Sequence, residues 1–336
     1  MQCYNRAMQS NKLIDSFGRQ VRYLRLSVTD RCNLRCTYCM AEDMVFLPKS
    51  KVLSIEEMIL VSKTFVELGV EKIRLTGGEP LVRNGLTELA QELNRLPGLG
   101  ELVMTTNGVL LDKHAKSLKD AGVSRLNISI DSLQEERFKS LTRFGQLSDV
   151  LRGIDAAQEA GFEKIKLNSV ILKGSNDDEI LPLVRFAVEK GLDISFIEEM
   201  PLGEISSHER DLTALSSDSI KSMLSGEFEL NDLNVVDPTS GPSRYLSLKG
   251  TNSKVGFISP MSNNFCSSCN RVRVTAEGLL LLCLGNENSL DLKNIVRNDP
   301  TSLKDQILNS MQHKPKQHYF DPKEITIRRH MSVTGG

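Results

Sequence analysis

Residues 23–40 of the chain read YLRLSVTDRCNLRCTYCM. The opening run, Tyr23–Val28, alternates apolar and polar side chains, which predicts a β-strand. Cys32, Cys36 and Cys39 follow it in the spacing C-x3-C-x2-C. Thiolates on one short loop can hold three corners of a [4Fe–4S] cube. The fourth iron then lacks a protein thiolate, so it can chelate a small molecule and pass it an electron.

A structural zinc site is the alternative for this loop. Structural zinc takes four ligands, and the histidine nearest to the loop in sequence is His114. The missing fourth ligand favours an iron–sulfur cluster.

Strand-like and helical segments alternate along the chain as far as Ile197. The clearest helix follows Ser54, which forms a capping box with Glu57 and is stopped by Gly69. The alternation predicts an α/β fold with a parallel sheet, and six βα units favour an incomplete (β/α)6 TIM-like barrel over a closed one. Ligands bind at the carboxyl ends of such strands. The predicted strands are Tyr23–Val28, Lys72–Thr76, Glu101–Thr105, Arg125–Ile130, Ile165–Leu172 and Asp193–Ile197. Further helices are expected near 86–95, 112–121 and 148–160, and from Asn176 to before Gly191.

The pattern breaks up after Gly203, and residues 232–254 are predicted to be turns because they are rich in Asn, Ser, Gly, Pro and Asp. We therefore divide the chain into an N-terminal segment (1–22), a partial barrel (23–230) and a C-terminal region (231–336).

The C-terminal region carries a second cysteine group, Cys266, Cys269 and Cys283, in the spacing C-x2-C-x13-C. A single C-x2-C fits zinc and iron–sulfur sites equally well, and the lack of a fourth cysteine favours a second cluster with an open iron. Arg271 and Arg273 would share one face of a strand, which suits an anionic ligand such as phosphate. A solvated basic strand is the alternative.

The overall composition excludes some partners. A formal net charge of −1 gives no general attraction to nucleic acid. The chain has no run of about eighteen apolar residues and no apolar signal-peptide core, so we expect a cytoplasmic protein without a membrane span. In that reducing compartment cysteines act as metal ligands or reactive thiols rather than as disulfides. Cys3 stands alone and is given no role.

The first cysteine group, with an aromatic residue before its last cysteine, resembles the radical S-adenosylmethionine superfamily. A second motif, Thr76-Gly77-Gly78-Glu79-Pro80, follows the second predicted strand. It resembles the loop with which that superfamily binds the methionine amino group. Its glycines allow close backbone approach, and Glu79 offers an acceptor for an ammonium group.

Together with Thr-Thr-Asn-Gly and C-x2-C-N-R-V-R-x9-C, these motifs resemble one group within the superfamily, the GTP 3′,8-cyclases, or molybdenum cofactor biosynthesis protein A. The similarity runs from Arg19 to Gly336 and includes the final Gly335-Gly336, a tail that the family needs for activity.

The resemblance implies two [4Fe–4S] clusters, S-adenosylmethionine and GTP. The first cluster would be held by Cys32, Cys36 and Cys39, and a second, substrate-binding cluster by Cys266, Cys269 and Cys283. The expected S-adenosylmethionine contacts are Tyr38, Gly78, Ser129 and Met200. The expected GTP contacts are Arg25, Arg74, Thr105, Lys166, Arg271, Val272 and Arg273.

The implied reaction is radical cyclisation of GTP to (8S)-3′,8-cyclo-7,8-dihydroguanosine 5′-triphosphate. The resemblance also implies a homodimer and a hand-off of the product to cyclic pyranopterin monophosphate synthase. The alternatives are a radical peptide maturase with an auxiliary cluster, an iron–sulfur electron carrier and a zinc-dependent nucleic-acid binder.

Overall fold

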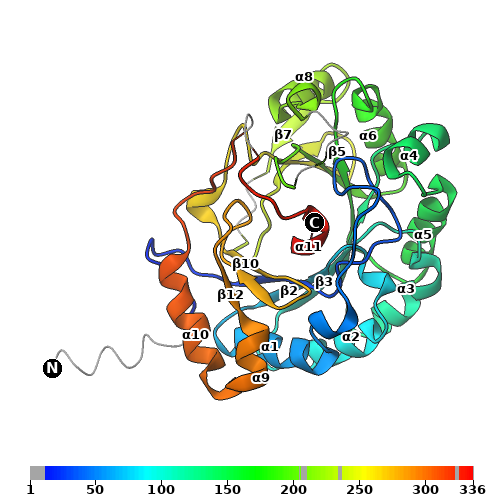
Figure 1. Cartoon of the computed structure of the whole chain (residues 1–336). Helices are drawn as coiled ribbons and strands as arrows, with labels where there is room; N and C mark the ends of the chain where they lie inside the picture. Colours follow the sequence, from blue (N-terminus) through cyan, green and yellow to red (C-terminus); the bar gives the residue numbers. More distant parts are fainter. Residues whose placement is uncertain (1–11, 204, 206–209, 234–236, 322–324, 336) are drawn as a thin grey trace.

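The computed structural model describes residues 12–203, 205, 210–233, 237–321 and 325–335, so Cys3 and Gly336 lie outside the described residues. Over these residues twelve strands form one open sheet in the order β12-β11-β10-β1-β2-β3-β4-β5-β6-β9-β8-β7. The sheet curls into a partial barrel with helices around it, and the short helix α11 (Met331–Thr334) lies inside the barrel (Figure 1). The predicted α/β fold with an incomplete barrel and a C-terminal extension is confirmed.

Parallel strands form the centre of the sheet, at the six predicted places. They are β1 (Tyr23–Ser27), β2 (Lys72–Thr76), β3 (Glu101–Thr106), β4 (Arg125–Ser129), β5 (Ile165–Val170) and β6 (Asp193–Ile197). The helices that alternate with them are α1 (Ile55–Glu67), α2 (Leu86–Asn94), α3 (Leu111–Asp120), α4 (Glu135–Thr142), α5 (Leu147–Glu159) and α6 (Ile180–Glu189). Of these, α4 was not predicted.

Helix α1 begins as the sequence predicts. The Ser54 N–H donates to the Glu57 carboxylate at 2.8 Å, and the Glu57 N–H donates to Ser54 Oγ at 3.2 Å. Gly69 has a φ of 93°, a left-handed conformation that glycine adopts without strain, so the chain turns there into β2.

The alternation along β1 separates the core from the barrel interior. Leu24 and Leu26 are fully buried in the apolar core between the sheet and the helices. Since successive residues of a strand point to opposite faces, Tyr23, Arg25 and Ser27 face the interior of the barrel. Polar side chains at alternate positions of the central strands therefore meet there.

The C-terminal region extends this sheet at both ends. β9 (Lys254–Ile258) pairs with β6 in parallel, and the antiparallel strands β8 (Arg244–Leu248) and β7 (Leu230–Asp232) follow. On the other side β10 (Arg271–Val274) pairs with β1 in parallel and is followed by β11 (Leu279–Leu281) and β12 (Ser289–Asp291). The remaining helices are α7 (Arg210–Thr213), α8 (Ser217–Ser225), α9 (Leu292–Asn298) and α10 (Leu303–Ser310).

The prediction that residues 232–254 are turns is wrong in part, because β8 lies within them. The five residues of β8 alternate between more exposed and more buried side chains, as a strand does, but turn-forming residues surround them in the sequence. Their partner β9 completes the hairpin only because it is itself paired with β6.

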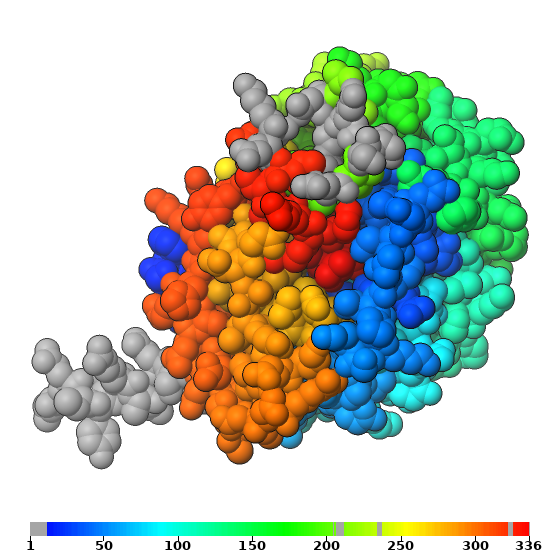
Figure 2. Space-filling model, viewed as in Figure 1, coloured from blue at the N-terminus to red at the C-terminus, as the bar shows by residue number. Residues whose placement is uncertain are grey.

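The C-terminal residues lie at the mouth of the barrel. In the space-filling view the red C-terminal residues lie between a blue surface, which the colour bar places near residue 50, and an orange surface of the C-terminal region (Figure 2). Among the described residues, each helix is too short or too polar to cross a membrane.

Candidate active site

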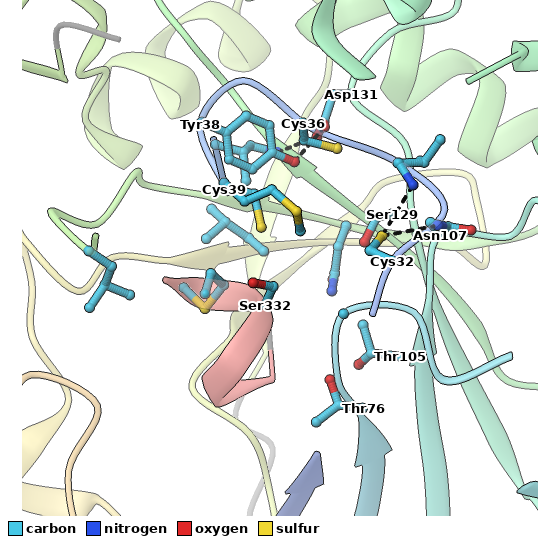
Figure 3. Close-up of a pocket in the computed structure, with 18 of the residues that line it drawn as sticks. Cys32, Cys36, Tyr38, Cys39, Thr76, Thr105, Asn107, Ser129, Asp131 and Ser332 are labelled. Carbon is cyan, nitrogen blue, oxygen red and sulfur yellow. Dashed lines mark hydrogen bonds between the residues drawn. The ribbon is translucent and has the colours of Figure 1, made fainter. Parts of the chain in front are cut away.

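Cys32, Cys36 and Cys39 lie around one cavity at the carboxyl end of the parallel strands (Figure 3). All three are half-buried, and among the described residues none of them forms a disulfide. The four residues expected to contact S-adenosylmethionine line the same cavity, and so does one residue expected to contact GTP. They are Tyr38, Gly78, Ser129, Met200 and Thr105.

The donor set of this loop fits an iron–sulfur cube. Burial raises the pKa of the Cys32 thiol to about 11 and that of Cys36 well above its usual range. A buried thiol in this state becomes a ligand when a metal replaces its proton. Within the described residues no three His, Cys, Asp or Glu side chains are grouped around a single ion. In a cube each thiolate binds a different iron, so the sulfurs need not converge on one point.

The glycine pair after β2 lets two backbone segments touch. The Gly78 N–H donates to the Thr29 carbonyl and the Glu79 N–H donates to the Arg31 carbonyl, both at 2.8 Å. A Cβ atom on Gly78 would lie 2.4 Å from the Arg31 oxygen, and one on Gly77 would lie 2.4 Å from the Thr29 oxygen. Residues with side chains therefore cannot hold this loop against the cysteine loop.

The Glu79 carboxylate accepts hydrogen bonds within the protein. It accepts from Thr106 Oγ1 and the Asn107 N–H at 2.7 Å each, and from the Leu81 N–H at 3.0 Å. Burial raises the pKa of Glu79 to about 7. The side chain is fully buried and ties the Gly-Gly loop to the end of β3.

Asp131 is a cavity residue that sequence reasoning missed. Its carboxylate accepts a hydrogen bond of 2.7 Å from the Tyr38 hydroxyl and one of 2.8 Å from the Val170 N–H. Burial raises the pKa of Asp131 to about 6. The carboxylate links the cysteine loop to β5, and its position two residues after Ser129, at the end of β4, is the signal that could have revealed it.

A row of cations crosses the barrel interior. Arg273, Arg25 and Arg74 lie opposite one another on the neighbouring strands β10, β1 and β2, so their side chains share one face. Burial lowers the pKa of Arg25 to about 10, and burial together with the charge of Arg25 lowers that of Arg273 well below its usual range. The proximity of these like charges indicates a site for a multivalent anion.

Two further cations and a tyrosine complete this surface. Arg74 donates to Thr105 Oγ1 at 3.1 Å and also to the hydroxyl of Tyr23, a residue that was not predicted. Lys166 is buried on β5, and burial lowers its pKa. Arg271 lies against the ring of Phe265, with 4.9 Å between the guanidinium carbon and the ring centroid.

Val272 points away from the predicted GTP contacts. It pairs with Leu24 in register and is 1 % exposed in the apolar core. Of the run 271–273, only the two arginine side chains face the interior, so Val272 could reach a ligand there through its main chain alone.

The C-terminal tail reaches this site. Met331 and Ser332 line the cysteine cavity. The carbonyl of Gly335 accepts hydrogen bonds from Arg25, at 3.3 Å, and from Arg273. Gly335 thus contacts two of the residues that we predicted to bind GTP.

The second cysteine group lies beside β10. Cys266 and Cys269 precede this strand, and Cys283 follows β11; all are free, half-buried thiols. Although burial opposes the effect, the charges of Arg271 and Lys314 lower the pKa of Cys269 to about 7. A thiolate with cationic neighbours of this kind suits an anionic cluster.

The open α/β barrel and the C-x3-C-x2-C loop define a radical S-adenosylmethionine protein, and residues 26–187 match the radical SAM superfamily. Residues 192–320 match Molybdenum Cofactor Synthesis C. The chain belongs to the family of the GTP 3′,8-cyclases. It is 56% identical to the GTP 3′,8-cyclase of Saccharophagus degradans over 98% of this chain and 100% of that protein. It is 55% identical to that of Pseudomonas putida (strain GB-1) over 97% of this chain and 99% of that protein.

A solved structure shares the fold. Streptococcus suis SuiB, in a crystal structure bound to S-adenosylmethionine, superposes with a TM-score of 0.62 over 92% of this chain and 70% of its own. At 14% sequence identity this likeness concerns the fold alone.

Proposed function

We propose that this chain cyclises GTP to (8S)-3′,8-cyclo-7,8-dihydroguanosine 5′-triphosphate, the first step of molybdenum cofactor biosynthesis. The observation that carries the proposal is the row of Arg273, Arg25 and Arg74 in the same barrel as the cysteine cavity. A triphosphate carries several negative charges on oxygens that accept from guanidinium groups, which suits a row of three arginines. Membership of the cyclase family, over nearly the whole chain, supports this reaction over peptide maturation.

The cofactors follow from the donor sets. Cys32, Cys36 and Cys39 would hold one [4Fe–4S] cluster, next to S-adenosylmethionine at Tyr38, Gly78, Ser129 and Met200. Cys266, Cys269 and Cys283 would hold a second cluster, whose open iron would bind the guanine ring. When bound, the first cluster and S-adenosylmethionine supply a 5′-deoxyadenosyl radical at the cost of one electron.

The protein's task is to place the substrate. Arg25, Arg74, Arg271, Arg273, Lys166 and Thr105 would bind GTP, with its triphosphate on the cations, and so bring ribose C3′ to the adenosyl group. The C3′–H bond breaks by hydrogen-atom transfer, the C3′–C8 bond forms, and the C8=N7 double bond opens. One further electron and a proton at N7 complete the product. A low-potential one-electron donor must therefore deliver two electrons per turnover.

The organisation of the chain is also proposed. Segment 23–230 would bind the first cluster and S-adenosylmethionine, and 231–336 would bind the second cluster and part of GTP. We place the protein in the cytoplasm, where thiols stay reduced. We also propose, from the family resemblance, a homodimer and a hand-off of the unstable product to cyclic pyranopterin monophosphate synthase.

The test is anaerobic reconstitution with iron and sulfide, followed by incubation with S-adenosylmethionine, a low-potential reductant and either GTP or ATP. We expect equal amounts of 5′-deoxyadenosine and cyclised nucleotide with GTP, as measured by mass spectrometry, and no cyclised nucleotide with ATP. Deoxyadenosine formation without any cyclised nucleotide would refute the proposal.

A further inference from the structure

Lys314 is a buried cation beside the second cysteine group. Only 2 % of the Lys314 surface is exposed. The residue follows the short 3-10 helix Met311–His313, which comes after α10. The ammonium group donates to the Arg271 carbonyl at 2.9 Å and to the Leu282 carbonyl. It also contacts Cys269 Sγ at 3.8 Å.

These contacts join the two halves of the cysteine group. Arg271 follows Cys269 by two positions at the start of β10, and Leu282 directly precedes Cys283. One ammonium group therefore fixes the main chain beside two of the three cysteines. Neighbouring Lys316 is exposed and serves as a matched comparison.

The charge of Lys314 requires a counter-charge, since a buried ammonium group is costly unless it is paired. Among the described residues, the polar atoms that its ammonium group contacts are two carbonyl oxygens and the sulfur of Cys269. Carbonyl oxygens carry partial charge only. The full negative charge must come from the thiolates and from what they bind.

We propose that Lys314 is a positioning residue for the second iron–sulfur cluster, which it stabilises in the reduced state by its charge and its hydrogen bond to Cys269. The inference rests on the second cluster of the proposed function. Reduction adds one electron from the external donor and breaks no bond, so a fixed cation next to a thiolate ligand favours the reduced form. The reduction potential of this cluster is raised as a result.

The donors that contact sulfur differ between Cys32 and Cys269. The sulfur of Cys32 contacts the amide groups of Leu34 and Asn107, whereas the sulfur of Cys269 contacts an ammonium group.

The test uses Lys314→Met, which removes charge and donor, Lys314→Gln, which keeps a donor, and Lys316→Met as the control. The iron content of each reconstituted holoprotein is measured. The reduction potentials of its clusters are then determined by a redox titration followed by electron paramagnetic resonance. A Cys269→Ala variant identifies the signal of the second cluster. In both Lys314 variants the ratio of reduced to oxidised second cluster at a fixed potential should be about tenfold lower. This corresponds to a reduction potential lowered by about 59 mV for a one-electron couple. The first cluster and the Lys316 variant should be unchanged.

An unchanged second potential in Lys314 variants with full iron would overturn the proposal. A Lys314→Met protein that loses about half of its iron, while Lys316→Met keeps it, would support the positioning role, because a merely exposed lysine would have no such effect. If the unsubstituted protein itself binds only about four irons per chain, it holds one cluster and not two. That result would refute the second cluster of the proposed function.

Discussion

Arg25, on the first strand, donates a hydrogen bond of 3.3 Å to the main-chain carbonyl of Gly335 in the C-terminal tail. Arg273 donates to the same carbonyl. The tail is therefore held by two of the cations that we assign to GTP. Phosphate is a stronger acceptor for guanidinium than a peptide carbonyl, so nucleotide binding and the position of the tail should be coupled.

Replacing Gly335 by Ala should abolish most of the activity. Gly335 has a φ of 76°, and an added Cβ would lie 2.3 Å from Thr76 Cγ2, so the tail must shift. Misplacement near the reacting atoms should lower GTP turnover by about a hundredfold or more. The product assay measures this loss.

Folding and iron content should stay intact in this variant and after deletion of Gly335 and Gly336. The control is Gly241→Ala, because Gly241 is exposed and has open space around it. Full turnover in the truncated protein would show that the tail is incidental to catalysis.

Replacing Arg25 or Arg273 by Gln should weaken GTP binding. Each change removes a charged donor from the buried row, and a charge-assisted hydrogen bond contributes about 1.5–3 kcal/mol. The KM for GTP should rise by roughly tenfold or more. Arg152→Gln on the exposed face of α5 is the control. Equal affinity of all three variants, by calorimetry, would exclude the row as the triphosphate site.

The two cysteine groups should bind iron independently. Reconstituted protein should contain about eight irons per chain. Cys36→Ala should contain about half as many, because this thiol lines the first cavity and is remote in sequence from the second group. Iron analysis measures the ratio. Undiminished iron in the variant would remove Cys36 from the ligand set.

The same groups should differ in function. Cys269→Ala should lose GTP cyclisation but retain some reductive cleavage of S-adenosylmethionine, because its sulfur belongs to the second group. Cys32→Ala should lose both reactions, since Cys32 lines the first cavity. Chromatography of 5′-deoxyadenosine and of the cyclised nucleotide separates the two. Cyclised nucleotide from the Cys269 variant would contradict the assignment.

Glu79 should make stability depend on pH. Its pKa is raised by burial to about 7, so between about pH 4.5 and 7 the folded state binds more protons than the unfolded state. Stability therefore falls as pH rises through this window, by on the order of 3 kcal/mol in full. Asp131, with a pKa of about 6, acts in the same direction.

The measurement is the thermal midpoint of the reconstituted protein and of Glu79→Gln at pH 5.5 and 8. The thermal midpoint of the variant, relative to that of the unsubstituted protein, should rise with pH, because glutamine is never ionised. Glu88→Gln, exposed on α2, should show no such trend. A constant difference between variant and parent would mean that Glu79 does not titrate in this range.

Most of the central barrel could be predicted because its signals are local. Strand alternation, the Ser54 capping box and stop glycines each depend on a few neighbouring residues. The C-terminal strands could not be placed, since β10 finds its partner β1 at the far end of the chain. A short alternating run is recognised as a strand only when such a partner is known.

Prediction of the candidate active site is limited in the same way, to features with a local signal in the sequence. Cysteine spacing and family motifs predicted several residues that line one cavity: Cys32, Cys36, Cys39, Tyr38, Gly78, Thr105, Ser129 and Met200. Asp131, Tyr23 and Lys314 were missed because their roles depend on partners brought close by folding.

The contact between the Gly-Gly loop and the cysteine loop has a consequence for electron transfer. Main chain packs on main chain there, through the Gly78–Thr29 and Glu79–Arg31 hydrogen bonds, without intervening side chains. Close-packed backbone yields little when the charge beside it changes. A redox centre held by such a loop needs little rearrangement of its surroundings as an electron arrives or leaves, so the reorganisation energy of the transfer is kept small.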